Sequence, residues 1–276
     1  MNTCKYEKQE ILITVKTYPT LSTKYMELVC TAGLTREGKW IRLYPVPFRM
    51  LETEGRYKKF QWITTEIFKN TEDPRPESFK IYDFNKILPG EEIPPDSTGE
   101  WHARRKLVLK QVYTSKNEII AKAKSMEMSL CTFKPKEILD FEFEPVEREW
   151  DEKKLAEIEA QNRQGDLFAQ DKNPFEVVKK LPYKFFFRFL DEDNIESRLM
   201  IEDWEIGALF WSCLARKKNE EEAIADVKNK YLEDFAKTKD LYLFLGTTRE
   251  HHSISRNPFV IVGVFPPKPV IQPLLF

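Results

Sequence analysis

The sequence predicts an α+β protein with a mainly β, barrel-like (OB-like) N-terminal domain and a C-terminal unit of order β-β-α-α-β-β. Two observations support this prediction. Apolar, β-branched runs of strand length, separated by proline-containing turns, dominate the first half. In the C-terminal third, two strand-like runs precede two helical patterns, and two more strand-like runs follow. This order differs from the regular β-α alternation of a doubly wound sheet.

The N-terminal strands are expected from apolar runs bounded by turns. Residues 36–38 form a short hairpin loop, because Gly38 can adopt a positive φ. Pro45 and Pro47 end the strand that follows, since proline has no N–H to donate to a sheet. Residues 86–101, rich in proline and glycine, are expected to be a loop. The expected strands are residues 11–18, 29–34, 39–46, 60–69 and 106–113.

The rest of the chain predicts alternating strands and helices. Strands are expected at 136–144, 183–190, 197–201, 240–246 and 258–265, and helices at 117–128, 147–164, 203–217 and 220–237. The helix at 147–164 is polar, and a linker-like segment follows it. We therefore divide the chain into a β-rich domain (1–146), a polar helix with linker (147–178) and an α+β domain (179–276).

Composition limits the class of protein. With 276 residues, 13% of them aromatic, the chain can build a sizeable core although 32% of its residues are charged. Its four cysteines (4, 30, 131 and 213) are scattered, which excludes a zinc ribbon and a disulfide framework. The N-terminus lacks an apolar signal core, and no apolar run is long enough to cross a bilayer. A cytoplasmic protein without membrane contact is expected.

Charge is segregated along a chain whose net charge is −1. Residues 36–62 hold seven basic and three acidic residues, residues 101–124 seven and one, and residues 137–166 four and eleven. Such changes in local net charge along the chain are also common on solvated surfaces. Any affinity for a polyanion must therefore come from a local patch.

The hairpin strand at 39–46 is a candidate nucleic-acid contact. Trp40, Arg42 and Tyr44 share one face of the strand, and Arg36 and Lys39 lie at the hairpin tip. Aromatic rings interleaved with cations hold single strands, because the rings stack on bases and the cations meet phosphates. In the alternative interpretation, the rings fill a core and Arg42 extends past them to water.

The segment VCTAGLTREGKWIRLYPV resembles the start of prokaryotic dual OB-containing domains. In those modules a strand that ends in small residues is followed by a second strand with the pattern Trp, Ile or Val, Arg. The matching residues are Cys30, Ala32, Gly33, Trp40, Ile41 and Arg42, within a resemblance that spans residues 11–46. It implies a β-barrel and an oligonucleotide-binding role, and no catalytic residue. The C-terminal half, with IEDWEIGALFW and LYLFLGTT, resembles uncharacterised prokaryotic proteins and implies no activity.

Two further segments carry basic residues beside rings or histidines. Arg104, Arg105 and Lys106 follow Trp101 and His102 and are candidate phosphate contacts.

In the loop 247–259, His251 and His252 lie between Arg249 and Arg256. Histidine titrates near neutral pH and arginine binds phosphate, so this loop is the candidate site for phosphodiester chemistry. A solvent-exposed loop is the alternative interpretation. Adjacent residues of an extended chain point in opposite directions, so only one histidine is expected to face a shared site.

Acidic residues give no metal or cofactor site. We interpret Asp140, Glu142 and Glu144 as the solvent-exposed face of an amphipathic strand. We interpret Asp203 as a helix cap, with Glu205 in the first turn of that helix. No GxGxxG, GxxxxGK[ST] or GxSxG motif occurs, which disfavours dehydrogenase, ATPase and serine hydrolase functions. No metal and no cofactor are expected.

The turn at 70–82 presents Arg75 and Glu77 at a bend fixed by Pro74 and Pro76. We interpret it as structural, and a ligand contact is the alternative interpretation.

The leading prediction is a non-enzymatic accessory protein of a prokaryotic cytosol that binds DNA or RNA. It requires the two basic segments, 36–62 and 101–124, to meet in one concave surface. Two alternatives stay open: an enzyme acting on phosphodiesters through His251 or His252, and a protein-interaction subunit whose partner docks on segregated charge and exposed aromatic residues.

Overall fold

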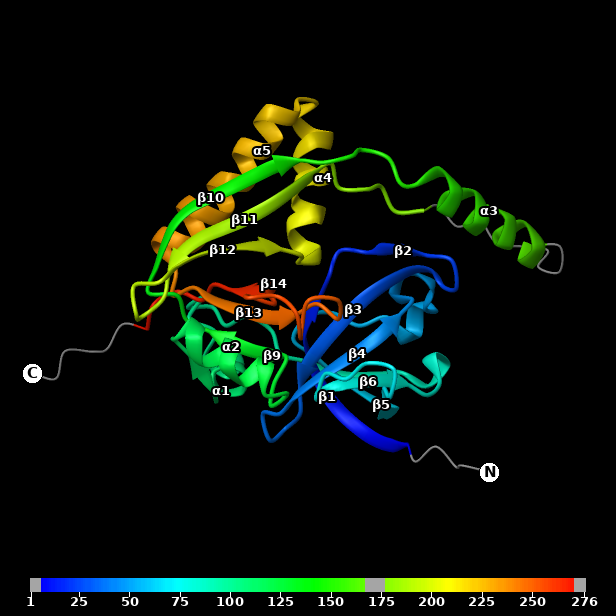
Figure 1. Ribbon diagram of the computed structural model, residues 1–276, viewed down its shortest axis with the longest axis horizontal. Helices are drawn as coiled ribbons and strands as arrows, with labels where there is room; N and C mark the ends of the chain where they lie inside the picture. Colours follow the sequence, from blue (N-terminus) through cyan, green and yellow to red (C-terminus); the bar gives the residue numbers. More distant parts are fainter. Residues whose placement is uncertain (1–5, 167–176, 271–276) are drawn as a thin grey trace, which may run out of the picture.

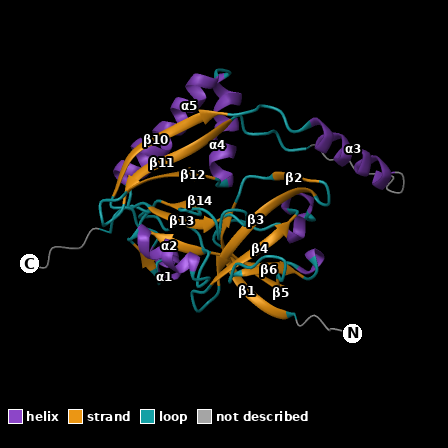
Figure 2. Cartoon of the chain, viewed as in Figure 1, coloured by secondary structure: helices purple, strands orange, loops and turns teal. Residues whose placement is uncertain are grey.

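The computed structural model describes residues 6–166 and 177–270. It is an α+β structure built on two sheets (Figures 1 and 2). Helices α4 (Trp204–Lys217) and α5 (Glu220–Lys228) cover one face of the second sheet. Helix α3 (Glu152–Asp166) extends to one side of the molecule, near strand β2.

The N-terminal region contains a closed five-stranded barrel. The strands follow the order β1, β3, β4, β6 and β5, and β5 pairs with β1 to close the barrel. Strands β4 and β6 are parallel, and the other neighbouring pairs are antiparallel. Two further strands extend this sheet, β2 beside β3 and β7 beside β5. The bounds are β1 Glu7–Lys16, β2 Thr20–Ser22, β3 Met26–Leu34, β4 Trp40–Val46, β5 Gln61–Lys69, β6 Ser78–Ile81 and β7 Leu88–Glu92.

Two positions in the barrel require glycine, Gly33 because two strands pack closely there and Gly38 because it lies in a tight turn. A Cβ added at Gly33 would lie 2.2 Å from the carbonyl oxygen of Leu12, so β1 and β3 approach closely only because residue 33 has no side chain. Gly38 has a φ of +89°, which confirms the conformation expected of the hairpin loop.

The second sheet is seven-stranded, in the order β10, β11, β12, β14, β13, β9 and β8. The pairs β12–β14 and β8–β9 are parallel, and the other pairs are antiparallel. The bounds are β8 Val112–Tyr113, β9 Leu130–Phe133, β10 Glu137–Pro145, β11 Tyr183–Leu190, β12 Glu196–Ile201, β13 Tyr242–Thr247 and β14 Phe259–Phe265.

The longer helices lie in the second half. They are α1 His102–Val108, α2 Lys116–Lys124, α3, α4, α5 and the π-helix η4 Asn229–Ala236, with short 3₁₀ turns η1 Phe48–Met50, η2 Thr53–Gly55 and η3 Phe84–Lys86. Asp203 caps α4 by accepting a hydrogen bond from the N–H of Glu205, as expected from the sequence.

Strands from before and after residue 146 share the second sheet. Strands β8, β9 and β10 precede that position: β9 pairs with β13, β10 pairs with β11, and β8 pairs with β9 at the edge of the sheet. Four strands of the C-terminal unit β11, β12, α4, α5, β13, β14 therefore belong to a wider sheet. The division of the chain at 146 and 179 stays a prediction, whereas the change from one sheet to the other falls between β7 and β8.

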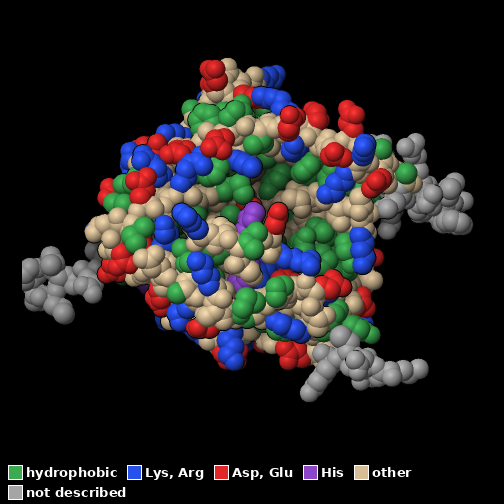
Figure 3. All heavy atoms as spheres, in the orientation of Figure 1, with side chains coloured by type: hydrophobic (Ala, Val, Ile, Leu, Met, Phe, Trp, Pro, Cys, Tyr) green, Lys and Arg blue, Asp and Glu red, His purple; other side chains and the backbone are tan. Residues whose placement is uncertain are grey.

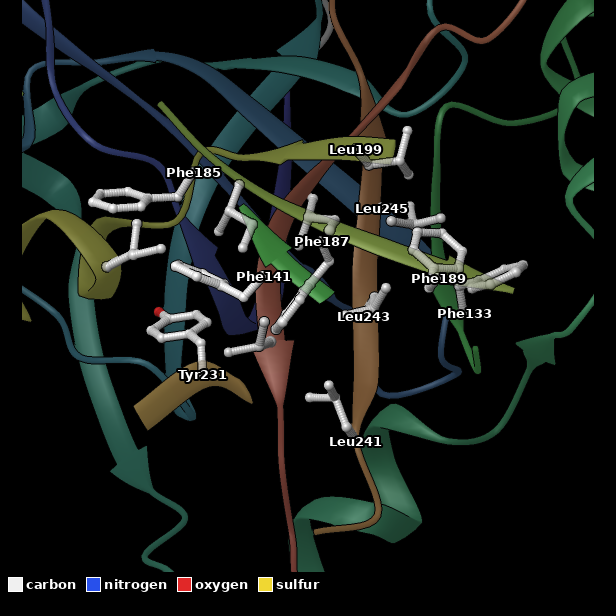
Figure 4. Packing of buried hydrophobic residues seen from close by; sticks show 14 of the residues in the cluster. Phe133, Phe141, Phe185, Phe187, Phe189, Leu199, Tyr231, Leu241, Leu243 and Leu245 are labelled. Atoms are coloured by element: carbon white, nitrogen blue, oxygen red, sulfur yellow. The ribbon is translucent and has the colours of Figure 1, made fainter. Parts of the chain in front are cut away.

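Aromatic rings fill the core between the second sheet and its helices (Figure 4). The ring of Phe141 packs against Phe185 at 5.6 Å, Phe187 at 5.7 Å and Tyr231 of η4 at 5.6 Å between centroids. Rings bury the most apolar area per residue, so these side chains supply much of the stabilisation of this half.

The two sheets are also joined by apolar packing. Val15 and Phe60 of the N-terminal region share a buried cluster with Leu130, Phe244 and Phe265 of the second sheet. The barrel and the second sheet therefore pack as one body in the described residues.

Two sequence expectations were wrong. Residues 106–113 are not one strand: α1 extends to Val108, and only Val112 and Tyr113 pair as β8. The buried residues of α1, Arg104 and Val108, are four apart, which is a helical spacing that a short apolar run conceals. The expected loop 86–101 contains β7, whose Pro89 is tolerated because β7 is an edge strand.

In the described part of the chain, no helix is both long enough and apolar enough to span a membrane.

Candidate functional site

A cleft of about 260 Å³ lies where the barrel meets the second sheet. The face shown in Figure 3 is hollowed near its centre, with a histidine and several Lys or Arg side chains beside the hollow. We call this cleft the arginine cleft. It is lined by Thr17, Thr20, Leu28, Cys30, Arg42, Tyr44, Arg75, Glu202, Thr247, Thr248, Arg249, Val260 and Val262.

Arg42 of β4 forms part of the inner wall and is only 2% exposed. Its Nη2 donates to the carbonyl oxygen (3.1 Å) and Oγ (3.2 Å) of Ser129, and its Nη1 donates to Sγ of Cys30. Its Nε is buried and has no hydrogen-bond partner in the described residues. Burial lowers the pKa of Arg42. The guanidinium remains charged and keeps one donor unused.

Arg75 is positioned by the turn between β5 and β6. Its Nη2 lies 2.6 Å from Oδ2 of Asp73, and its Nη1 donates to the carbonyl oxygen of Thr247 in the second sheet. Asp73 also accepts a hydrogen bond of 2.7 Å from Ser78. Burial raises the pKa of Asp73, but the hydrogen bonds from Arg75 and Ser78 outweigh it and lower the pKa to about 2. The turn therefore holds a charged pair at the cleft wall.

Tyr44 and Arg249 form the more accessible part of the cleft. Tyr44 is half-buried and Arg249 is exposed. Burial raises the pKa of Tyr44, and the nearby positive charges of Arg75 and Arg249 oppose this increase. No carboxylate of the described residues pairs with Arg249 within salt-bridge distance. The ring of Tyr44 and the guanidinium of Arg249 thus line the same opening.

Glu202 is the single acid of the cleft lining, against three arginines. Burial raises the pKa of Glu202, and the charge of Arg42 partly offsets this effect. The arginine cleft therefore carries a local positive excess in a chain of net charge −1. In the described residues, no group of three or more His, Cys, Asp or Glu side chains is placed to hold a metal ion.

The two adjacent histidines of the loop 247–259 diverge. His251 is exposed, whereas His252 is 1% exposed, with Nδ1 2.8 Å from Oγ1 of Thr247 and Nε2 3.2 Å from Sδ of Met126. Burial, together with the charge of Arg75, lowers the pKa of His252. Neither histidine lines the arginine cleft, so the structure does not bring them together at a phosphate site.

Arg42, Tyr44 and Arg249 are the sequence-predicted site residues that line the arginine cleft. Lys39 and Trp40 line a separate groove of about 690 Å³, together with Lys110 of the second basic segment. That groove joins both basic segments, but four glutamates and only two lysines line it. It is therefore unsuited to a polyanion.

The other predicted contacts are dispersed. Arg36 pairs with Glu10 at 2.7 Å, and Arg105 pairs with Asp240 at 2.8 Å. Lys106 and Arg256 are exposed and line none of the cavities described here. Arg104 is buried at a third cavity. Arg42 is also buried, so its role as an open surface contact needs correction: it is a wall residue held by Ser129.

Two charged residues of the lining, Arg75 and Glu202, were not among the predicted site residues. Arg75 lies at the bend made by Pro74 and Pro76, which was interpreted as structural, with a ligand contact only as the alternative. Glu202 gave no signal, because it is one acid among many near the start of a helix. Its place in the cleft depends on contacts between distant parts of the chain.

Comparison with protein families finds two matches. Residues 7–110 match a family described as Domain of unknown function (DUF8758), and residues 112–276 match one described as Domain of unknown function (DUF8757). The two matched regions meet where the chain passes from the barrel sheet to the second sheet. No curated protein sequence matches the chain.

Proposed function

The chain belongs to the family described as Domain of unknown function (DUF8757), and we propose that it binds single-stranded nucleic acid in the arginine cleft. One observation carries the proposal: the cleft occupies the face of the barrel that an OB-fold uses for oligonucleotides. That face consists of the second and third barrel strands and of the loops between strands one and two and between strands four and five.

The correspondence follows from the order of the barrel strands. Counted along the chain, β1, β3, β4, β5 and β6 are barrel strands one to five. Strands two and three supply Cys30, Arg42 and Tyr44 to the cleft lining. The first of the two loops supplies Thr20, and the second supplies Arg75. We therefore interpret the barrel as OB-like.

The chemistry of the lining fits the backbone and bases of a single strand. Arginine binds phosphate oxygens through a planar fork of donors, and Arg249 is exposed and lacks a carboxylate partner in the described residues. Tyr44 offers a half-buried ring for stacking on a base. The site thus combines cations and a ring, which sequence-tolerant single-strand binding requires.

Fluorescence anisotropy with a labelled oligonucleotide of about 12 nucleotides tests the proposal, because single-strand sites on OB-folds span roughly 4–16 nucleotides. We expect wild-type binding to weaken with salt, and Arg249→Ala to reduce the slope of log K against log salt by about 0.7, the value of one phosphate contact. Tyr44→Ala is expected to cost about 1–3 kcal/mol of binding free energy.

Arg216→Ala is the matched control. Arg216 is 66% exposed, pairs with Asp226 on the helices of the second sheet and does not line the cleft. Its replacement is expected to leave the affinity and the salt slope unchanged. Equal effects of Arg249→Ala and Arg216→Ala, or no binding by the wild type at low salt, would contradict the proposal.

A further inference from the structure

A second cavity, of about 640 Å³, shares no lining residue with the arginine cleft. Its wall combines the segment before β5, helix α1, helix α4, the π-helix η4 and the end of β14. Cavities of roughly 300–1,000 Å³ hold small-molecule ligands. We call it the Arg104 cavity, after the residue that determines its chemistry.

Arg104 is a buried cation without an anionic partner. It is 8% exposed, and its Nε donates to the carbonyl oxygen of Ile93 at 2.8 Å. Its guanidinium carbon lies 4.1 Å from the ring centroid of Phe60 and 5.2 Å from that of Trp101. No carboxylate of the described residues forms a salt bridge with it. A guanidinium does not deprotonate in proteins, so a buried one needs an anion.

Two lysines add to the positive charge of the cavity wall. Lys230 and Lys239 both contact Asp234, at 2.6 and 3.2 Å. One carboxylate cannot neutralise two ammonium groups, so this trio keeps an excess positive charge. Lys59, which also lines the cavity, is already paired with Asp203 and Glu205. Among the lining residues, four cations thus stand against two carboxylates, Glu205 and Asp234, and the charge of Glu205 also acts on Arg104. The wall keeps a positive excess.

The backbone around Arg104 is irregular on two sides. Phe60 has a φ of +59° and Trp101 a φ of +57°, in the left-handed region that bulky residues rarely adopt. The π-helix η4, a rare conformation that is frequent at functional sites, also lines the cavity. Such costly conformations persist where the surrounding structure holds them, and they cluster at ligand sites.

Aromatic rings supply the rest of the wall. Trp101 and Phe235 are half-buried and line the cavity, and the ring of Phe60 lies beneath Arg104. Rings favour a flat ligand, and the cations favour an anionic one.

We propose that the Arg104 cavity binds a small molecule that joins a phosphate to a planar ring, of the class of the nucleoside monophosphates. The phosphate contacts Arg104 and the lysines, and the base packs against the aromatic wall. This site is separate from the arginine cleft and does not depend on the function proposed for that cleft.

Isothermal titration calorimetry of the full chain with AMP, GMP, CMP and UMP tests the proposal, with adenosine and inorganic phosphate as partial ligands. We expect at least one nucleotide to bind, and both partial ligands to bind more weakly. Arg104→Gln is expected to weaken binding by about tenfold or more, because a charge-assisted hydrogen bond is lost. Lys239→Ala is expected to weaken it several-fold, and this more accessible position decides the result if Arg104→Gln does not fold.

Two control variants distinguish the Arg104 cavity from other sites. Lys237 lies beside the π-helix, pairs with Glu233 and does not line the cavity, so Lys237→Ala should bind normally. Arg249→Ala should also bind normally, since Arg249 lines only the arginine cleft. Absence of binding by all four nucleotides at millimolar concentration would overturn the proposal. So would unchanged binding by a folded Arg104→Gln or by Lys239→Ala, or loss of binding in Arg249→Ala.

Discussion

Replacing Asp73 by asparagine tests how the wall of the arginine cleft is held. Asp73 is buried, and its carboxylate contacts the guanidinium of Arg75 and the hydroxyl of Ser78. These partners lower its pKa from 3.8 to about 2. At about 1.36 kcal/mol for each pH unit, the charged carboxylate stabilises the fold by about 2 kcal/mol near neutral pH. Asparagine resembles the protonated acid, so we expect Asp73→Asn to lose about this amount of unfolding free energy.

The sign of the pH dependence follows from the lowered pKa. The unfolded chain takes up the proton at a higher pH than the folded chain, so the stabilisation is present above about pH 4 and is lost as the pH falls towards 2. About half of it remains near pH 3. Urea unfolding of wild type and Asp73→Asn at a series of pH values measures the difference, which should shrink over this range.

Glu72→Gln is the control in the same turn. Its carboxylate pairs with Lys80 but is 71% exposed, so its loss should change the unfolding free energy by less than about 1 kcal/mol. A difference between wild type and Asp73→Asn that stays constant from neutral pH to pH 3 would refute the reasoning. So would an Asp73→Asn variant as stable as Glu72→Gln.

Two further substitutions test contacts elsewhere in the fold. Lys59→Met leaves the fully buried Asp203 without its ammonium partner and should cost about 3–5 kcal/mol in urea unfolding. The double variant Lys59→Met/Asp203→Asn removes the unpaired charge but keeps a side chain that can cap α4, so it should recover part of the loss. Equal stability of the single and double variants would contradict this explanation. Gly33→Ala places a Cβ 2.2 Å from the carbonyl oxygen of Leu12 and should lower the unfolding free energy by about 1–3 kcal/mol, which is measured as a lower Tm. An unchanged Tm would contradict this expectation, because it would show that β1 and β3 can move apart without cost.

Much of the fold was predictable because its strands follow simple patterns. The runs at 11–18, 39–46 and 183–190 alternate or are continuously apolar, and they correspond to β1, β4 and β11. The bounds of β11 are those predicted, whereas β1 begins at Glu7, before the apolar run. Strand β6 was missed because only four residues, Ser78–Ile81, follow a proline-rich turn. Such a short strand is specified by its parallel pairing with β4, which is a tertiary contact rather than a local signal.

The candidate site was less predictable than the fold. Arg42 and Tyr44 were found together because alternate residues of a strand share a face. That Arg42 is buried depends on Ser129, far along the chain, and no pattern in the hairpin indicates it. Arg104 was selected for its charge and neighbouring rings, yet the helix of α1 directs it into a different cavity.

The arginine cleft belongs to both family-matched regions of the chain rather than to the barrel alone. Arg42 and Arg75 come from the region that matches the first family, and each donates to a backbone carbonyl of the second, at Ser129 and Thr247. These bonds fix two long side chains that water would otherwise surround, and they leave the Nε of Arg42 buried and unused. The arginine cleft is therefore formed jointly by the barrel and the second sheet. If the cleft binds a single strand as we propose, the second sheet is part of the binding site as well as a support for the barrel.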